Sequence, residues 1–217
     1  MMLVDPRSTT DSDAATTPLV RVVDDEPAIR NLFGRIGKLC GFEVECSATA
    51  KSFLDAFEHE RPGCVVIDLM LPDRSGIEVL EEVCELGSEL PVVFMSGMAR
   101  VSEAVQALKL GSIDFVEKPF DVHQIADILR RAVDLDLRRR QTGANQEQVR
   151  QRFESLTPRE RQVMEQIVRG AANKEVAASL GLSHKTVEVH RANVMRKTRA
   201  GSLAELVRMH VTVHTQD

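Results

Sequence analysis

Aromatic residues are scarce in this chain of 217 residues, which has no tryptophan, no tyrosine and only 8 phenylalanines. Few aromatic side chains are therefore left to line an apolar ligand pocket. Cysteine is also sparse, with four residues at Cys40, Cys46, Cys64 and Cys84. Their wide, irregular spacing includes no Cys-x-x-Cys pair and no nearby histidine cluster, which argues against a zinc site and predicts small, reduced, buried thiols.

Long hydrophobic runs are absent as well. No apolar stretch reaches the roughly 18 residues that span a bilayer, and the N-terminus lacks the basic-then-apolar order of a secretory signal. We therefore expect a soluble, cytoplasmic protein with no membrane partner. The 43% of hydrophobic residues suffice for one full-sized domain and one small one.

Charge is distributed unevenly along the chain. Residues 1–120 contain 11 basic and 21 acidic residues, a net charge of −10, whereas residues 121–217 contain 17 and 12, a net charge of +5. A small basic domain suits a polyanion such as nucleic acid, and an acidic domain often carries a cation site made of carboxylates. We expect the two parts of the chain to have different partners.

The apolar pattern of the first part predicts an α/β domain. Residues 1–18 lack apolar periodicity and are expected to form a disordered N-terminal tail. Short apolar runs then alternate with segments of helical periodicity, and these runs are Leu19–Val23, Phe42–Cys46, Cys64–Ile67, Pro91–Met95 and Ile113–Val116. Runs that are apolar throughout indicate strands buried on both faces, so residues 19–137 should form a doubly wound, five-stranded parallel sheet of flavodoxin-like type.

The second part predicts a small all-α domain. A fifth helix should begin near Asp121, and the polar stretch 138–154, with Gly143 inside it, is interpreted as a partly helical linker that extends this helix. Residues 155–217 should then form four short helices. The first start is marked by a capping box of Thr157 with Glu160 and the next two by cap residues at Asn173 and Ser183, and the fourth helix is expected from Ser202 to about His210. Two of these helices are joined by a tight Gly-Leu turn, which is typical of a helix-turn-helix unit.

Carboxylates follow the predicted strands at the edge where open parallel sheets place their ligands. Asp24 and Asp25 come directly after the first strand, and Asp68 follows the third. Three carboxylates at one edge repel one another unless a divalent cation neutralises them, and oxygen ligands favour Mg²⁺. Ser96 and Lys118, after the fourth and fifth strands, offer a hydroxyl and an ammonium that can hold the oxygens of a phosphoryl group.

The segments VVDDEP, VVIDLMLPDRSG, VVFMSG and DFVEKPF, in this order, resemble the receiver domain of two-component response regulators over Leu19–Arg140. The resemblance implies that Asp68 is the phosphoacceptor, with a sensor histidine kinase as donor. It implies Mg²⁺ as the cofactor, with ligands at Asp24, Asp25, Asp68 and the backbone carbonyl of Met70. Ser96 and Lys118 would assist the transfer, Ser96 and Phe115 would be the switch residues, and the Lys118–Pro119 bond would be cis.

The segment LTPRERQVMEQIVRGAANKEVAASLGLSHKTVEVHRANVMRKTRA resembles the LuxR-type helix-turn-helix and, with the receiver, indicates the NarL/FixJ family, with TVEVHRANVM especially FixJ-like. Candidate DNA contacts are Asn173, Lys174, Ser183, Lys185, Thr186, Glu188, Val189, His190, Arg191 and Ala192. Glu188 can accept from cytosine N4, Val189 can touch a thymine methyl, and Lys185 or Arg191 can meet phosphate. His190 is favoured as a core or phosphate-contacting residue.

Phosphorylation is expected, by the same resemblance, to move Ser96 and turn Phe115 inward. The surface of helix four and strand five, about Ala99–Lys109 and Ile113–Glu117, would then form a homodimer, with helices one and five as the alternative face. The implied function is a transcription factor that binds double-stranded promoter DNA, with RNA polymerase as a further partner and activation favoured over repression. The chain would not be an enzyme, beyond assisting its own phosphorylation and dephosphorylation.

Three other interpretations account for fewer of these residues. A phosphatase of the haloacid-dehalogenase type also uses an Asp and Mg²⁺, but it carries a DxDxT motif that IDLML lacks. A small-molecule sensor joined to the same helix-turn-helix would leave Asp24, Asp25, Asp68 and Lys118 unexplained. A receiver that binds protein partners, with a helix-turn-helix that contacts no DNA, is distinguished only by a binding assay.

Overall fold

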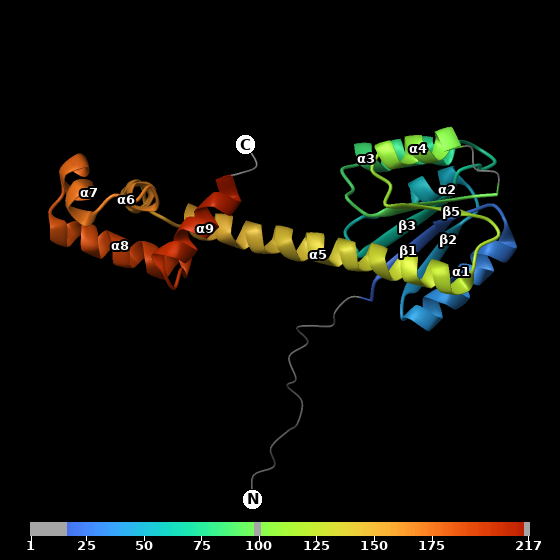
Figure 1. Ribbon diagram of the computed structural model, residues 1–217, viewed down its shortest axis with the longest axis horizontal. Helices are drawn as coiled ribbons and strands as arrows, with labels where there is room; N and C mark the ends of the chain where they lie inside the picture. The colour runs from blue at the N-terminus through green and yellow to red at the C-terminus, as the bar shows by residue number, and fades with distance from the viewer. Residues whose placement is uncertain (1–16, 98–100, 215–217) are drawn as a thin grey trace, which may run out of the picture. The chain divides into compact units, whose positions relative to one another are not determined.

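The computed structural model describes residues 17–97 and 101–214. The chain divides into two compact units, residues 1–139 and 140–217, and the division falls inside one helix (Figure 1). Nearly all of the expected tail at 1–18 lies outside the described residues. In the described ranges, no helix is both long and apolar enough to cross a lipid bilayer.

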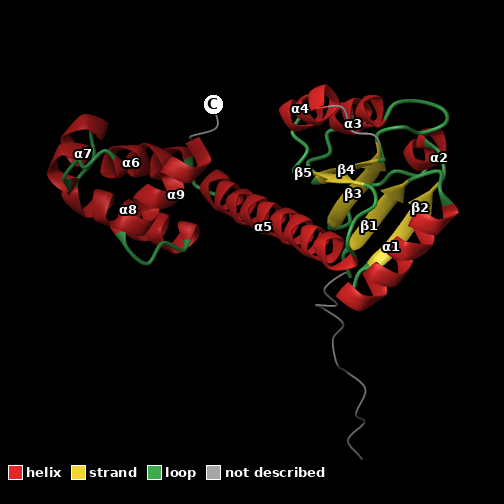
Figure 2. Cartoon of the chain, turned by 45° about the vertical axis from the view of Figure 1, so that its right-hand side comes forward, coloured by secondary structure: helices red, strands yellow, loops and turns green. Residues whose placement is uncertain are grey.

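The N-terminal unit is built on a five-stranded sheet, as the apolar runs predict (Figure 2). The strands are β1 (Leu19–Val23), β2 (Glu43–Ser47), β3 (Gly63–Asp68), β4 (Val92–Ser96) and β5 (Asp114–Glu117). They lie in the order β2-β1-β3-β4-β5, and every neighbouring pair is parallel. All the carboxyl ends therefore meet at one edge of the sheet.

Helices cover both faces of this sheet (Figure 1). They are α1 (Pro27–Cys40), α2 (Ala50–Asp55), α3 (Gly76–Glu85), α4 (Val101–Lys109) and α5 (Val122–Glu154). On one face, Phe33 of α1 and Leu129 of α5 pack in a buried core. On the other, Phe53 of α2, Leu80 of α3 and Ala107 of α4 form a second core. The expected doubly wound architecture is confirmed.

The second strand departs from the expectation. Its apolar run predicts burial on both faces, but Glu43, Glu45 and Cys46 of β2 are exposed. The prediction is wrong here because β2 is an edge strand with one neighbour, so part of its surface faces solvent. The expectation of buried thiols also holds only in part. Burial raises the pKa of Cys64 to about 12, whereas Cys46 and Cys84 are exposed.

Helix α5 runs from Val122 to Glu154 without interruption, so the stretch interpreted as a partly helical connection is helical throughout. Its start agrees with the prediction, because the Asp121 carboxylate accepts the backbone N–H of His123 at 2.7 Å. Asp136, only 2% exposed, accepts the N–H of Gly63 at 2.9 Å and so ties α5 to the beginning of β3.

The later part of α5 belongs to another core. Val149 and Phe153 are buried with residues of the C-terminal unit, while no residue of 137–148 is buried. This middle stretch therefore has little tertiary packing to hold it helical. The assignment of 138–154 as the linker stays a prediction.

The C-terminal unit contains the four short helices that the cap residues predict. They are α6 (Pro158–Val168), α7 (Asn173–Leu180), α8 (His184–Thr198) and α9 (Leu203–His214). The capping box of Thr157 with Glu160 is confirmed, and so is the cap at Ser183. The cap predicted at Asn173 is wrong. Asn173 is the first residue of α7, because Glu175 accepts the N–H of Ala172 at 2.7 Å and shifts the start.

An ion pair joins the start of α6 to the end of α8 in the C-terminal unit. Glu160, 4% exposed, receives the Lys197 ammonium at 2.6 Å, and Lys197 also donates to the Ser155 carbonyl at 3.2 Å. Burial raises the pKa of Glu160, but the bonds from Lys197 and Thr157 outweigh it and the pKa is lowered. The pair fixes the end of α8 against the start of α6.

Substitution of Gly76 by alanine should lower the free energy of unfolding by about 1–3 kcal/mol. A Cβ at this first residue of α3 would collide with the backbone oxygen of Asp68, which has no flexible way out. Gly34→Ala is the matched control, because nothing lies within 4 Å of its Cβ position in α1. That variant should gain roughly 0.5–1 kcal/mol from helix propensity. Urea unfolding followed by circular dichroism measures the free energy of unfolding of both variants. Equal changes in the two would contradict the close approach of the Gly76 Cβ position to the Asp68 backbone oxygen.

Candidate functional site

The sheet topology brings the predicted carboxylates together. Asp24 directly follows β1 and Asp68 ends β3, and these strands are neighbours that pair Val23 with Ile67. The N–H of Asp24 donates to the Ser47 carbonyl at 3.0 Å, which anchors the turn after β1. Carboxylate oxygens of Asp24, Asp25 and Asp68 all lie within 4.8 Å of one another. The predicted acidic cluster is therefore formed.

This cluster fits a divalent cation. Asp24 has no exposed surface and Asp68 is 6% exposed, while Asp25 is open to solvent. Burial raises the pKa of Asp24, and the bonds from Lys118 and Glu26 only partly offset it. Its raised pKa means that the ionised carboxylate weakens the fold as the pH rises through that value. A cation in contact with these oxygens would remove that cost, and an all-oxygen donor set suits Mg²⁺.

Lys118 lies at the centre of the negative charge. Its Nζ is 2.6 Å from Asp68, 2.8 Å from Asp24 and 2.9 Å from Glu26. Burial by itself lowers the pKa of Lys118, but the three hydrogen bonds outweigh burial and raise the pKa well above its usual range. The ammonium is therefore charged throughout the neutral range. The Lys118–Pro119 bond is cis, as the resemblance implies.

Two residues of this site were not found from the sequence. Glu26 adds a third carboxylate to Lys118. Arg30 of α1 donates to the backbone carbonyls of Asp24 and Asp25, at 2.7 and 2.8 Å. The guanidinium thus holds the turn that presents both side chains. In the sequence, Arg30 is recognisable only as a basic residue one turn into α1. That position does not reveal hydrogen bonds to main-chain carbonyls.

The remaining predicted residues of the N-terminal unit lie around the same edge. Met70 donates its N–H to the Asp68 carboxylate at 2.9 Å, and its side chain is 72% exposed. Ser96 ends β4 with 1% exposure, and its carbonyl accepts the N–H of Lys118 at 2.8 Å. Phe115 of β5 is half-buried against the core that contains α3 and α4. Ser96 and Lys118 thus reach the edge from adjacent strands.

The loop after β3 is held by a residue that the sequence analysis did not single out. The Asp73 carboxylate accepts the N–H groups of Ala50 at 3.0 Å and Lys51 at 2.9 Å, at the start of α2. These backbone hydrogen bonds, that of Lys51 first, lower the pKa of Asp73. The loop that carries Met70 is therefore fixed at its far end.

Helix α8 presents the outward stripe that its periodicity predicts. Val187 and Val194 have no exposed surface, while Lys185, Glu188, Val189 and Ala192 are exposed. Ser183 and Thr186 share a hydroxyl contact of 2.7 Å at the start of the helix. Glu188 has its side chain 55% exposed and lies 3.5 Å from His184, one turn earlier. Base contact by these residues stays a prediction.

Four further candidates lie on α7 and α8. Arg191 donates to the Asn173 side chain at 3.1 Å, so these two predicted phosphate contacts are joined across the helix pair. Lys174, next to Asn173, is exposed. His190 is half-buried, and its Nδ1 is enclosed without a hydrogen-bond partner in the described part of the chain. These positions place His190 between the core and the surface.

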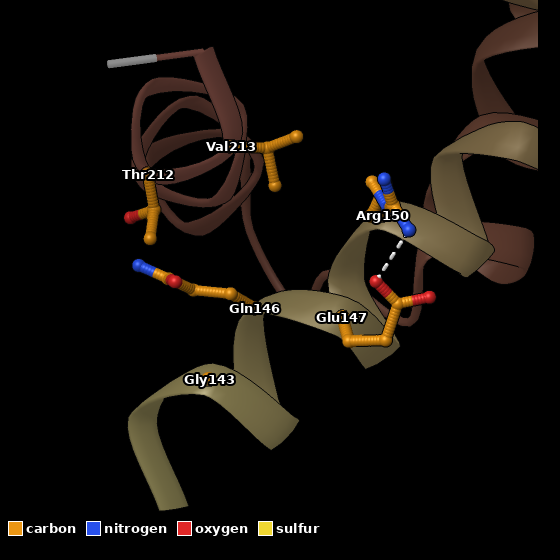
Figure 3. Close-up of a pocket in the computed structure, with 6 residues that line it drawn as sticks. All are labelled: Gly143, Gln146, Glu147, Arg150, Thr212 and Val213. Atoms are coloured by element: carbon orange, nitrogen blue, oxygen red, sulfur yellow. Dashed lines mark ion pairs between the residues drawn. The ribbon is translucent and has the colours of Figure 1, made fainter. Parts of the chain in front are cut away.

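A hollow between α5 and α9 in the C-terminal unit contains none of the predicted residues (Figure 3). It is lined by Gly143, Gln146, Glu147, Arg150, Thr212 and Val213. Arg150 and Glu147 form an ion pair of 2.7 Å, and Gln146 points toward Thr212 (Figure 3). The hollow is open and polar, and among the described residues the candidate metal cluster lies instead at the sheet edge.

Comparison with protein families assigns both units. Residues 20–130 match the response regulator receiver domain, and residues 154–210 match the LuxR family of bacterial regulatory proteins. The transcriptional regulatory protein FixJ of Azorhizobium caulinodans is 42% identical over 88% of this chain and 90% of its own length. The response regulator protein TodT of Pseudomonas putida is 34% identical over 91% of this chain and 86% of its own length.

Two solved structures match most of the chain. The response regulator StyR matches with a TM-score of 0.81 and 38% identity, over 89% of this chain and 98% of that chain. Full-length FixJ from B. japonicum matches with a TM-score of 0.58 and 37% identity, over 93% of this chain and 100% of that chain. The chain therefore belongs to the FixJ-like response regulators, and it is a transcription regulator of a two-component system, with a receiver domain and a LuxR-type DNA-binding domain.

Proposed function

We propose that Asp68 is the phosphoacceptor and that its phosphorylation controls DNA binding by α8. The observation that carries this proposal is the contact of 2.6 Å between the buried Asp68 carboxylate and Lys118 at the carboxyl edge of the sheet. An Asp68 oxygen attacks the phosphorus of a kinase phosphohistidine, the P–O bond forms, and the P–N bond breaks with its electron pair left on the imidazole. Lys118 neutralises the charge that accumulates on the transferred oxygens.

Asp24, Asp25, Asp68 and the Met70 carbonyl are the proposed Mg²⁺ ligands. A bound Mg²⁺ would supply two positive charges to the oxygens of the transferred group. The short distances among the three carboxylates and the raised pKa of Asp24 support this assignment. Arg30 and Asp73 keep the two ligand-bearing loops in place through backbone groups. Both matched families are typical of non-enzymatic regulators.

The proposed switch runs from Ser96 and Phe115 to a dimer surface on α4 and β5. Phosphorylation adds about 1.5 to 2 negative charges next to Ser96. Phe115 lies on β5, in the surface that would dimerise, and is only half-buried, so an inward turn would bury more of its ring. Apolar residues are exposed on α4 and directly after it, at Val105, Leu108 and Leu110. Helices α1 and α5 remain the alternative face.

The C-terminal unit is the proposed reader of promoter DNA. The proposed contacts lie on two helices. On α7 they are Asn173 and Lys174, and at the start of α8 and along it they are Ser183, Lys185, Thr186, Glu188, Val189, His190, Arg191 and Ala192. The exposure of the α8 stripe supports them. The same proposal includes the domain boundaries, with a receiver at 19–137, a linker at 138–154 and a DNA-binding domain at 155–217. It also includes a cytoplasmic location, a histidine kinase as phosphoryl donor, RNA polymerase as a partner and activation of transcription.

Asp68→Asn should abolish phosphate-dependent dimerisation, because an amide cannot accept the phosphoryl group. Sedimentation velocity with and without acetyl phosphate and Mg²⁺ measures the effect. Asp55→Asn, on the exposed end of α2, is the matched control and should dimerise like the parent chain. A phosphate-dependent dimer that survives in Asp68→Asn would refute the assignment of Asp68.

Lys118→Met should lower the free energy of unfolding on the order of 3 kcal/mol without Mg²⁺, since it leaves Asp24 and Asp68 without their cation. The Lys118 pKa is raised, so its contribution is complete below the ordinary value of 10.5 and is lost only as the pH rises through the folded value. Mg²⁺ should therefore raise the melting temperature more in this variant than in the parent at pH 7.

The matched control is Lys51→Met, because Lys51 pairs with Asp55 in an exposed position with its side chain 73% accessible. Its cost should stay below about 0.5 kcal/mol, and Mg²⁺ should act on it as on the parent. Thermal melting with and without Mg²⁺ decides. An equal Mg²⁺ response in Lys118→Met and in the parent would show that Lys118 and the cation do not share these carboxylates.

Leu108→Lys should weaken the phosphorylated dimer about tenfold or more, since a charge replaces an apolar side chain that the dimer would bury. Leu108 lies on α4 and is 53% exposed in the single chain, so the monomer should fold normally. Leu39→Lys tests the alternative face, because Leu39 of α1 is 77% exposed. Sedimentation equilibrium with acetyl phosphate compares the two. Weakening by Leu39→Lys alone would move the dimer to α1 and α5.

A further inference from the structure

The exposed stripe of α8 extends beyond the residues that the sequence analysis proposed for DNA contact. Lys185, Glu188, Val189 and Ala192 are exposed, and Arg196 follows them on the same side of the helix. The spacings of 3, 4, 7 and 11 residues from Lys185 correspond to one face of a helix with about 3.6 residues per turn. A single surface therefore runs along nearly the whole of α8.

The orientation of this stripe is fixed by the core. Val187, Val194 and Thr198 have no exposed surface, and Thr198 donates its hydroxyl to the Val194 carbonyl at 2.8 Å. Rotation of α8 would expose these side chains to water. The order of side chains along the stripe is therefore a fixed property of the unit. A cation stands at each end, and a carboxylate and small apolar groups stand between them.

The cations of α8 divide into two groups. Lys197 is held by Glu160 at 2.6 Å and by the Ser155 carbonyl, and Arg191 donates to Asn173 at 3.1 Å. These two side chains join helices within the unit. Arg196 is different, because it is exposed and donates within α8 itself, to the neutral Asn193 side chain at 3.2 Å. Its positive charge is therefore open to a partner outside the unit.

We propose that Arg196 is a second phosphate anchor of the DNA-binding surface and acts with Lys185 from the opposite end of α8. The proposal rests on the DNA binding proposed above and adds a residue to it. Eleven residues of helix span about 16 Å. The major groove is about 12 Å wide. A helix lying in the groove with cations this far apart can reach phosphates on both walls, while Glu188, Val189 and Ala192 face the bases.

A purely structural role for Arg196 predicts a different result. A cation in the last turn of a helix also interacts favourably with the helix dipole, and the bond to Asn193 would stabilise the same turn. In that case replacement of Arg196 would change the melting temperature and leave the electrostatics of DNA binding unaltered. Phosphate contact is recognised instead by the salt dependence of the affinity, because each contact releases counterions.

Arg196→Gln is the test variant, and Arg159→Gln is its matched control. Arg159 of α6 is also exposed and also donates to an amide three residues away, Gln162 at 3.0 Å, but it lies outside α8. Arg196→Lys keeps the charge and should behave like the parent. The full chain, with acetyl phosphate and Mg²⁺, is titrated into a fluorescently labelled mixed-sequence DNA duplex at several salt concentrations. Circular dichroism checks that each variant is folded.

Arg196→Gln should reduce the slope of log affinity against log salt by about 0.9, while Arg159→Gln and Arg196→Lys leave it unchanged. The loss of affinity between about 50 and 200 mM salt would then be roughly threefold smaller than in the parent. Combination with Lys185→Gln should remove a second, additive increment. If the parent chain binds DNA but the slope is unchanged in Arg196→Gln, the role of Arg196 as a phosphate anchor is refuted, while the proposal of DNA binding stands. Absence of salt-dependent binding by the parent overturns both.

Discussion

The ammonium group of Lys118 is the interaction on which the carboxyl edge of the sheet depends. It brings carboxylates from the turn after β1 and from the end of β3 within 2.9 Å of a single nitrogen that follows β5. Its one positive charge faces four carboxylates when Asp25 is included, so the cluster keeps a negative excess. This negative excess favours binding of a divalent cation at the edge, and in the proposed function the cation and Lys118 together offset the charge of the phosphoryl group. Structural stability and chemistry are therefore set by one small set of charges.

The opposite end of β3 gives this site a physical connection to the rest of the receiver. Asp68 ends the strand, and Gly63 begins it with an N–H that the buried Asp136 of α5 accepts. The six residues of β3 between these two points are fully buried and packed on both faces, so the strand does not bend easily. Helix α5 then continues through 137–148, where nothing is buried, into the core that contains Val149 and Phe153. Packing is tight where α5 meets β3 and where it enters the C-terminal core, and it is looser over 137–148, where Arg139 still donates to the Glu89 carbonyl at 3.0 Å.

The sequence allowed the architecture and most of the acidic site to be predicted, for reasons that differ between elements. Central strands β1, β3 and β4 were recognisable because they are mostly apolar. Asp24, Asp25 and Asp68 followed from the rule that parallel strands end together. The expectation that a strand is buried on both faces failed at β2, because an edge strand has a neighbour on one side only and part of its surface faces solvent. Asn173 was assigned as a cap from its residue type, but the reciprocal bond of Glu175 moved the helix start by one residue. Arg30, Glu26 and Asp73 were missed because their partners are backbone groups or charges distant in sequence.

The charge pattern of α8 explains why a phosphorylation switch would suit this DNA-binding domain. The centre of its outward stripe carries Glu188, Val189 and Ala192, which can read base edges but contribute no attraction to phosphate. Affinity must then come from a few cations at the margins, and a surface with few phosphate contacts binds weakly at physiological salt. Two copies held together double the number of contacts, and the second engages at a high effective concentration. Under the proposed function, weak binding by one domain is what would let dimerisation, controlled at Asp68, decide whether the promoter is occupied.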